Sequence, residues 1–264
     1  MEEEIKEVMR IVNKSDLNSL FAYEEIFATF LYFKHFSFPS SLLKSKSVFY
    51  RTRNNKNKSF TEFSDLSCPD ASLIHNYSRA NKPHQNVFYI SDKYETTRNE
   101  LLPTWSHDAP INYQFDITIS LWQLNEDIFV ALVPEKSNPT FHEYFKKNFS
   151  AIEIEFLNWV TDKFSAKILE NPNVYKFTSA LCNVLLNRET KQKNWGTLYT
   201  SVHSRGEIGK GYNIALIPES LKLFTLQDVY KQTIIKVGKE KWEDLGTPIK
   251  AKLDYNAQKI IWKD

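Results

Sequence analysis

Apolar residues near the N-terminus recur at the spacing of one face of an α-helix. They are separated mostly by steps of three and four: Leu20, Tyr23, Phe27, Phe30 and Leu31. Ser15 lies upstream of them, where a serine hydroxyl can cap a helix. The pattern predicts a helical N-terminal extension over residues 1–46. Its aromatic face either packs on the rest of the chain or binds a partner.

After residue 46 the pattern changes to short runs of β-branched and aromatic residues between polar turns, which is typical of β-strands. We expect strands at Ser47–Arg53, Val87–Ser91, Gln114–Leu124 and Asp127–Val133. A helix is expected from Lys93 to Leu102, and Pro103 would end it. Asp92 and Glu95 have the spacing of an acidic cap for this helix.

A helical pattern returns near residue 140. Ser150 and Glu153 have capping-box spacing, as do Thr140 and Glu143. Apolar residues then follow along one face: Leu157, Val160, Phe164 and Ile168. A further helix is expected at Val174–Arg188, and Trp195–Asp264 alternates short strands with turns. The predicted fold is α+β, with a main domain at 47–264 that carries a helical insertion at about 139–190.

Composition places the chain among ordinary globular proteins. It has 264 residues, of which 42% are hydrophobic, and a formal net charge of +2. A nucleic-acid partner is therefore not expected, although the Lys-rich NNKNKS loop could form a local patch. The first nine residues contain no apolar signal-peptide core, and no stretch approaches 18 apolar residues. We expect a cytoplasmic protein with no membrane partner.

Several common kinds of site are excluded by inspection. The chain has only six glycines and contains neither GxGxxG nor GxxxxGK[ST], so Rossmann and P-loop nucleotide sites are not expected. Its two cysteines, Cys68 and Cys182, form no CxxC, and its six histidines include no HExxH and no i, i+4 pair. We expect no metal site. GxSxG, the motif of many serine hydrolases, is also absent.

Arginine is uncommon in this chain, with seven residues against 27 lysines. Arg51 lies in a predicted strand and Arg79 in a turn before one. A guanidinium group binds phosphate through two parallel hydrogen bonds, which a lysine cannot do. The two arginines are therefore either anion-binding groups or members of ordinary ion pairs.

Glu95 and Glu100 are two candidate carboxylates on the same predicted helix. They are five residues apart, which turns their side chains about 140° from one another, so they cannot face one cleft together. Glu100 precedes Leu101 and Leu102, which suggests a side chain turned inward. A buried carboxylate needs a partner or a function.

The ordered set of motifs resembles the RES family, which is named for an Arg, a Glu and a Ser. The matching stretches are FYRTR, SRANKP, VFYIS, ETTRNE, LYTSV and GYNIALIP. They run from about Ser47 to Pro218, with DITISLW matching a further strand. No single stretch is specific, whereas their order and spacing are. Two positions depart from the family pattern, because Ser78 replaces a Gly and Thr200 replaces a Pro.

The resemblance implies a fold and a set of site residues. The fold would be an ADP-ribosyltransferase-like core with a split β-sheet. The family's Arg, second Arg, Tyr, Glu and Ser correspond to Arg51, Arg79, Tyr89, Glu100 and Ser201. Tyr89 and Glu100 are eleven residues apart, as this family's pattern requires, and this favours Glu100 over Glu95.

The resemblance also implies an activity. Members of this family are bacterial toxins, usually encoded with an antitoxin, that consume NAD as substrate. Some are similar to NAD phosphorylases or glycohydrolases, and others are mono-ADP-ribosyltransferases that modify a protein. The acceptor, whether water, phosphate or a protein, stays open. A different class also stays open, namely a non-catalytic nucleotide- or partner-binding module.

In an NAD site of this family, Tyr89 would stack on nicotinamide and Glu100 would hold the ribose hydroxyls. Three further residues, Arg51, Arg79 and Ser201, would fix the ribose and the pyrophosphate. We also expect binding contacts from Tyr50, Asn81 and Asn213. Cleavage of the nicotinamide bond develops positive charge on the ribose, which a nearby carboxylate stabilises.

Overall fold

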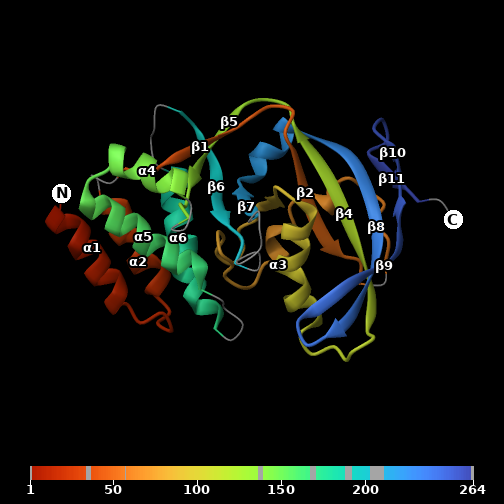
Figure 1. Ribbon diagram of the computed structural model, residues 1–264, viewed down its shortest axis with the longest axis horizontal. Coiled ribbons are helices and arrows are strands. Elements are labelled where there is room, and N and C mark those ends of the chain that lie inside the picture. Colours follow the sequence, from red (N-terminus) through yellow and green to blue (C-terminus); the bar gives the residue numbers. More distant parts are fainter. Residues whose placement is uncertain are drawn as a thin grey trace.

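A computed structural model describes residues 2–33, 37–56, 58–135, 139–166, 171–187, 192–202 and 211–262. Within these ranges one large sheet has the strand order β1-β5-β6-β7-β3-β2-β4-β8-β9 (Figure 1). Its strands are β1 (Ser40–Leu43), β2 (Val48–Asn54), β3 (Phe88–Ser91), β4 (Gln114–Leu124), β5 (Ile128–Leu132), β6 (Asn194–Thr200), β7 (Tyr212–Leu216), β8 (Phe224–Gly238) and β9 (Lys241–Lys250). A small hairpin consists of β10 (Lys252–Asp254) and β11 (Lys259–Ile261).

The helices are α1 (Glu2–Lys14), α2 (Ala22–Tyr32), α3 (Tyr94–Ser106), α4 (Pro139–Asn148), α5 (Ala151–Ser165) and α6 (Tyr175–Asn187). Short 3₁₀ turns occur at Ser64–Leu66, Ala71–Leu73, Pro172–Val174 and Pro218–Leu223. In the large sheet, β5 and β6 are parallel and the other neighbouring strands are antiparallel. The predicted α+β class is confirmed at this level.

The large sheet is nearly divided between β3 and β2. These two strands share a single residue pair, Tyr50 with Ser91, whereas β2 pairs with β4 over seven positions. One half therefore consists of β1, β5, β6, β7 and β3, and the other of β2, β4, β8 and β9. Although β4 and β5 follow one another in the chain, they lie in different halves, since β4 pairs with β2 and β8 and β5 with β1 and β6.

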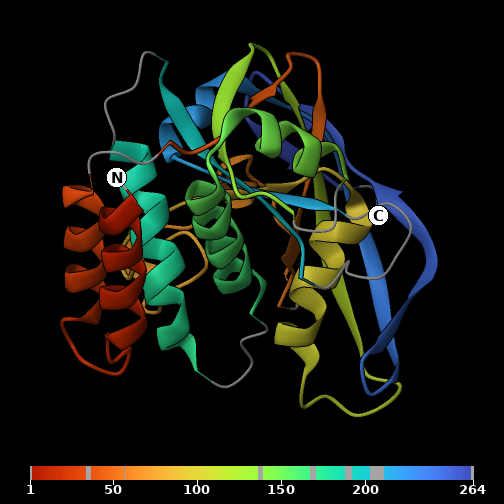
Figure 2. The ribbon, with the colours of Figure 1, turned by 60° about the vertical axis from the view of Figure 1, so that its left-hand side comes forward.

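Helices cover one face of both halves. α1, α2, α5 and α6 pack on the face of β3, β6 and β7 that carries Tyr89, Tyr199 and Ala215. α3 packs on the same face of the other half, over Ile117, Ile119 and Tyr50. Figure 2 shows α5 between the group α1, α2 and α6 and the separate α3. The C-terminal end of β6 and the N-terminal end of β7 thus lie between α3 on one side and α5 with its neighbouring helices on the other.

The opposite face of the sheet is covered by loops and the small hairpin. Phe88 and Trp122 pack there against aromatic and aliphatic residues that include Leu66 and Ile260. The backbone N–H of Phe63 donates to the carbonyl of Gln258 at 3.0 Å, which fastens the loop to the β10–β11 hairpin. The central strands of the sheet are therefore buried on both faces.

The N-terminal helices pack on the main domain, as one of the two sequence alternatives predicted. Phe30 is fully buried, and its ring lies 5.5 Å from that of Phe177 in α6. Tyr23 is buried as well, whereas Leu20 and Leu31 are 86% and 49% exposed. The apolar stripe is thus only partly a core face.

The boundaries of the N-terminal segment differ from the prediction. Ser15 does not cap a helix, because it follows the end of α1 and its hydroxyl donates to the carbonyl of Ile11. Residues 40–43, expected to be helical, form β1 at the sheet edge. β9 forms the other edge and was also not predicted. Most residues of these outer strands are exposed, so their sequences lack the alternation that marks a half-buried strand.

The predicted end of α3 at Leu102 is wrong. The helix continues to Ser106 with Pro103 inside it. A proline lacks the N–H that would bond to the preceding turn, which weakens a helix. The buried ammonium of Lys236 stabilises the end of this one, because it donates to the carbonyls of Ser106, His107 and Ala109 at 2.9, 2.9 and 2.6 Å.

The predicted cap of α3 is also wrong. Lys93 occupies the cap position and makes no side-chain cap hydrogen bond. The carboxylate of Asp92 instead accepts from the backbone N–H of Tyr212 at 2.8 Å and from the hydroxyl of Thr96 at 3.3 Å. Asp92 therefore joins the start of α3 to the start of β7.

The predicted helical insertion contains α4, α5 and α6. The predicted capping box at Ser150 is present, since the carboxylate of Glu153 accepts from the backbone N–H of Ser150 at 2.8 Å. The side chain of Thr140 and the whole of Ile168 and Arg188 lie outside the described residues. The insertion places the ends of α5 and α6 beside β6.

Candidate functional site

The carboxylate of Glu100 meets the end of β6. Its Oε1 atom accepts from the hydroxyl of Ser201 at 2.5 Å and from the backbone N–H of Val202 at 3.0 Å. Ser201 is fully buried, and its backbone N–H donates to the carbonyl of Gly211. The structure thus brings together the Glu and the Ser that the sequence singled out, which are 101 residues apart.

The packing of α3 against the start of β7 sets the direction of Glu100. Thr96, one turn earlier on the same side of α3, lies against Gly211. A Cβ atom on Gly211 would be 1.7 Å from the hydroxyl oxygen of Thr96, so only glycine permits this approach. Glu95 points elsewhere and is exposed, as the helical angle between the two glutamates predicted.

Tyr89 is held by its hydroxyl. This group accepts from the backbone N–H of Ala80 at 3.0 Å and donates to Oδ1 of Asn81 at 2.8 Å. Burial raises the pKa of Tyr89, so the hydroxyl stays protonated and remains a donor. The side chain of Asn81, itself buried, therefore positions the Tyr89 ring on the helix-covered face of β3.

Arg79 is buried beside the ends of two helices of the insertion. Its guanidinium donates to the carbonyl of Phe164 in the last turn of α5, where the helix dipole favours a positive charge. The guanidinium carbon lies 5.3 Å from the ring centre of Tyr175 and 5.8 Å from that of Tyr199. Within the described parts of the chain no carboxylate pairs with Arg79, so the ion-pair alternative gains no support there.

Tyr199 connects these groups and was not among the residues that the sequence singled out for a role. It precedes Ser201 by two residues, so the alternation of a strand places both side chains on one face. Its ring lies 5.6 Å from that of Phe164. Burial raises the pKa of Tyr199, and the nearby Tyr89 and Glu100 add to this effect. Tyr199 thus lies between the carboxylate of Glu100 and the guanidinium of Arg79.

Asn213 and Tyr50 lie on the same face of the sheet. The hydroxyl of Ser91 donates to Oδ1 of Asn213 at 2.7 Å, and both residues are buried. Asn213 is opposite Tyr199 in the β6–β7 register. Tyr50 is opposite Ser91, but its ring packs beneath α3 with Leu102 and Ile119. Asn213 therefore borders the site, and Tyr50 supports the helix that carries Glu100.

Arg51 points to the other face of the sheet, because consecutive strand residues alternate and Tyr50 occupies the helix-covered face. Its guanidinium donates to the carbonyl of Tyr89 at 2.7 Å and lies 5.6 Å from the ring centre of Phe88. It thus bridges β2 and β3 at the point where they separate. Burial, with a smaller effect of Arg53, lowers the pKa of Arg51 to about 10. In the described structure its buried Nε has no hydrogen-bond partner.

Four of the predicted site residues therefore gather around Tyr199, namely Glu100, Ser201, Arg79 and Tyr89. The sequence analysis also did not identify Phe164 and Tyr175 as neighbours of the site. Their positions are set by the packing of the insertion, and nothing local in the sequence marks them. The Tyr-Thr-Ser order in β6 was the one available signal for Tyr199.

Other features of the molecule lie away from this group. A polar pocket of about 440 Å³ is lined by residues that include Asn55, Asp116 and Thr233, none of them predicted for the site. No cluster of three or more potential metal ligands occurs among the residues whose positions are described. Cys182 is buried, which raises the pKa of its thiol to about 12.

Comparison with known proteins adds no family assignment. No protein-family model and no curated protein matches the chain. In the described part of the chain, no helix is long and apolar enough to cross a membrane.

Proposed function

We propose that this chain is a RES-type toxin that degrades NAD by cleaving the bond between nicotinamide and ribose. The observation that carries the proposal is the convergence on one oxygen of Glu100 of two donors from the end of β6. The contact joins the Glu and the Ser that the RES resemblance singles out. The near division of the sheet between β2 and β3 is consistent with an ADP-ribosyltransferase-like core.

The groups around Glu100 suit this chemistry. Its Oε1 is occupied by Ser201 and Val202, while Oε2 has no hydrogen-bond partner in the described part of the structure. Oε2 can therefore accept from a ribose hydroxyl and stabilise the positive charge that develops as nicotinamide leaves. The partly exposed ring of Tyr89 offers aromatic surface for the nicotinamide ring. Arg79 supplies positive charge for the pyrophosphate.

In the proposed reaction, the bond between the ribose C1′ and the ring nitrogen of nicotinamide breaks, and nicotinamide leaves with the bonding electron pair. An acceptor oxygen forms a new bond to C1′. With water, the products are nicotinamide, ADP-ribose and one proton. With phosphate, they are nicotinamide and ADP-ribose 1″-phosphate. With a protein side chain, the product is an ADP-ribosylated protein.

The direct test incubates the purified protein with NAD, with and without phosphate, and measures nicotinamide and the ADP-ribosyl product by chromatography. We expect nicotinamide release in at least one condition. The second product identifies the acceptor. Binding of NAD without release would favour the non-catalytic nucleotide-binding module, and the absence of both would reject the proposal.

A toxin that consumes NAD depletes a metabolite that its own cell needs. We therefore propose a bacterial, cytoplasmic protein that acts together with a cognate antitoxin. Expression of the chain alone should slow bacterial growth and lower cellular NAD. Growth at the control rate with unchanged NAD would contradict the toxin role.

Replacing Arg79 by Lys is expected to raise KM for NAD about tenfold, with a smaller fall in kcat, whereas Arg51→Lys should leave KM near the wild-type value, because Arg51 lies on the other face of the sheet. A charge-assisted hydrogen bond contributes about 1.5–3 kcal/mol, and lysine cannot reproduce the bidentate hydrogen bonds of a guanidinium group to a phosphate. Steady-state kinetics on the purified variants measure both constants. Arg51→Lys and Arg53→Lys are the controls, since both arginines lie on β2, where Arg51 donates to the carbonyl of Tyr89 and Arg53 to that of Asp65. A Lys variant with unchanged KM would assign that arginine a purely structural role.

A further inference from the structure

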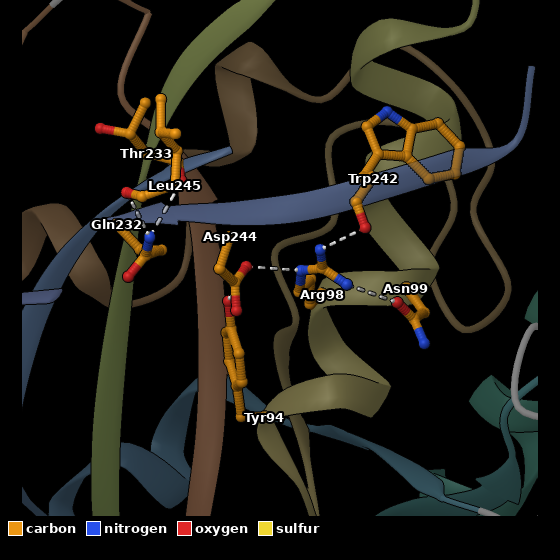
Figure 3. Close-up of polar contacts among 8 residues, drawn as sticks. All are labelled: Tyr94, Arg98, Asn99, Gln232, Thr233, Trp242, Asp244 and Leu245. Carbon is orange, nitrogen blue, oxygen red and sulfur yellow. Dashed lines mark hydrogen bonds and ion pairs between the residues drawn. The ribbon is translucent and has the colours of Figure 1, made fainter. Parts of the chain in front are cut away.

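α3 is held on two opposite sides. Glu100 and Thr96 face β6 and β7. Tyr94 and Arg98 face the β8–β9 hairpin, as Figure 3 shows. Arg98 and Glu100 are two residues apart, which places their side chains about 200° apart around the helix axis. A displacement of α3 away from the hairpin therefore changes the reach of Glu100.

Asp244 of β9 is the centre of the contact on the hairpin side. Its Oδ1 pairs with Nε of Arg98 at 3.1 Å and accepts from the hydroxyl of Tyr94 at 3.1 Å. Arg98 also donates to the carbonyl of Trp242 at 2.9 Å. The Arg98 side chain is only 14% exposed, against 43% for Asp244. The guanidinium is thus largely removed from water and depends on these acceptors.

A second contact comes from Trp242, two residues before Asp244 on β9. The indole N–H of Trp242 donates to the hydroxyl of Ser106 at 2.7 Å. Together, Asp244 and Trp242 contact α3 near its first, second and last turns. The hairpin therefore follows the length of the helix instead of touching one end.

α3 makes a narrow apolar contact with the sheet, through buried Leu102 and partly buried Tyr94 and Trp105. Of its buried residues, Thr96, Thr97 and Ser106 are polar and only Leu102 is apolar. The helix has no side-chain cap and contains Pro103. Polar contacts therefore supply much of what positions the helix, namely those of the β8–β9 hairpin and those of Lys236 at its C-terminal end.

We propose that Asp244 is a positioning residue for Glu100: through Arg98 and Tyr94 it holds α3 at the distance at which the Glu100 carboxylate reaches Ser201 and Val202. The inference deepens the proposed function, on which its relevance to NAD turnover rests. The contact itself is a property of the fold. It can therefore be measured without any substrate.

The test measures hydrogen exchange of the Val202 backbone amide, which donates to Glu100. In Asp244→Ala we expect this amide to exchange about fivefold faster than in the wild-type protein, because coupling through a packed element is of that order. Glu100→Ala, which removes the acceptor, marks the upper limit. Glu243→Ala is the matched control: it removes the same charge from the adjacent residue, whose partner is Lys241 on the same strand.

Asp244→Asn is the second variant, and it decides the question if Asp244→Ala does not fold. It keeps an acceptor for Tyr94 but lacks the charge that pairs with Arg98, so its exchange should lie between those of the wild-type protein and Glu100→Ala. Exchange at the rate of Glu243→Ala would overturn the proposal. So would a Glu100→Ala protein whose Val202 amide exchanges no faster than in the wild-type protein.

Turnover separates this inference from the proposed function. If the wild-type protein cleaves NAD, Asp244→Ala should lower kcat about fivefold and change KM less than twofold, because Arg79 and Tyr89 stay in place. An unchanged kcat would overturn the positioning role. If the wild-type protein releases no nicotinamide, the proposed function fails, and the exchange measurement still decides whether Asp244 places Glu100.

Discussion

Glu100→Gln is expected to lower kcat for NAD by about 100-fold or more while the protein stays folded. A glutamine keeps an oxygen that can accept from Ser201 and Val202, so the contact with the end of β6 survives. It lacks the negative charge that stabilises the ribose as nicotinamide leaves. Nicotinamide release by the variant and the wild-type protein measures the difference.

Glu95→Gln is the control for this experiment. Glu95 lies on the same helix and carries the same charge, but it is exposed and does not cap the helix. Its turnover should match that of the wild-type protein. Equal turnover in Glu100→Gln and Glu95→Gln would reject Glu100 as the catalytic carboxylate.

Phe30→Ala is expected to reduce the free energy of unfolding by about 3–5 kcal/mol, the range for a fully buried aromatic residue. The side chain is inaccessible to solvent and packs against the rings of Trp159 and Phe177. Its removal leaves a cavity between the N-terminal helices and the insertion. Urea unfolding followed by circular dichroism measures the change.

Phe21→Ala serves as the comparison, since Phe21 immediately precedes α2 and is 67% exposed. Its unfolding free energy should stay within about 0.5 kcal/mol of the wild-type value. If Phe30→Ala were as mild as Phe21→Ala, α1 and α2 would not be part of the folding core. They would then be a separable extension that serves another purpose.

The sequence prediction of strands was correct for those that lie in the centre of the sheet. β4 has the predicted bounds, Gln114–Leu124, because apolar and polar residues alternate along most of it, as in the segment FDITISL. β1 and β9 were missed because edge strands keep most side chains in water. Pro103 was taken as the end of α3, since the stabilising ammonium of Lys236 is over 130 residues away in the chain. Such a contact has no local signal.

The candidate site was also predicted only in part, because some of its contacts join residues that are distant in the sequence. Glu100 and Ser201 could be singled out from the order of short motifs, and helical geometry alone separated Glu100 from Glu95. The roles of Phe164, Tyr175 and Asp244 could not be predicted, because each reaches the site through packing of an element that is distant in sequence. Arg51 was expected in the same NAD site as Glu100, but strand alternation and the gap between β2 and β3 direct it to the other face.

The sequence by itself determined the α+β class, most of the central strands, the helical insertion and the chemical groups available for a site. Those features depend on local spacing of apolar residues and on side-chain chemistry, which act over a few residues. Only the tertiary structure decided which groups meet, because Glu100, Tyr199 and Arg79 come from a helix, a strand and a turn. Their meeting depends on the separation of the two half-sheets and on Gly211, which lets α3 approach β7. It also depends on the β8–β9 hairpin, which contacts α3 on the side opposite Glu100.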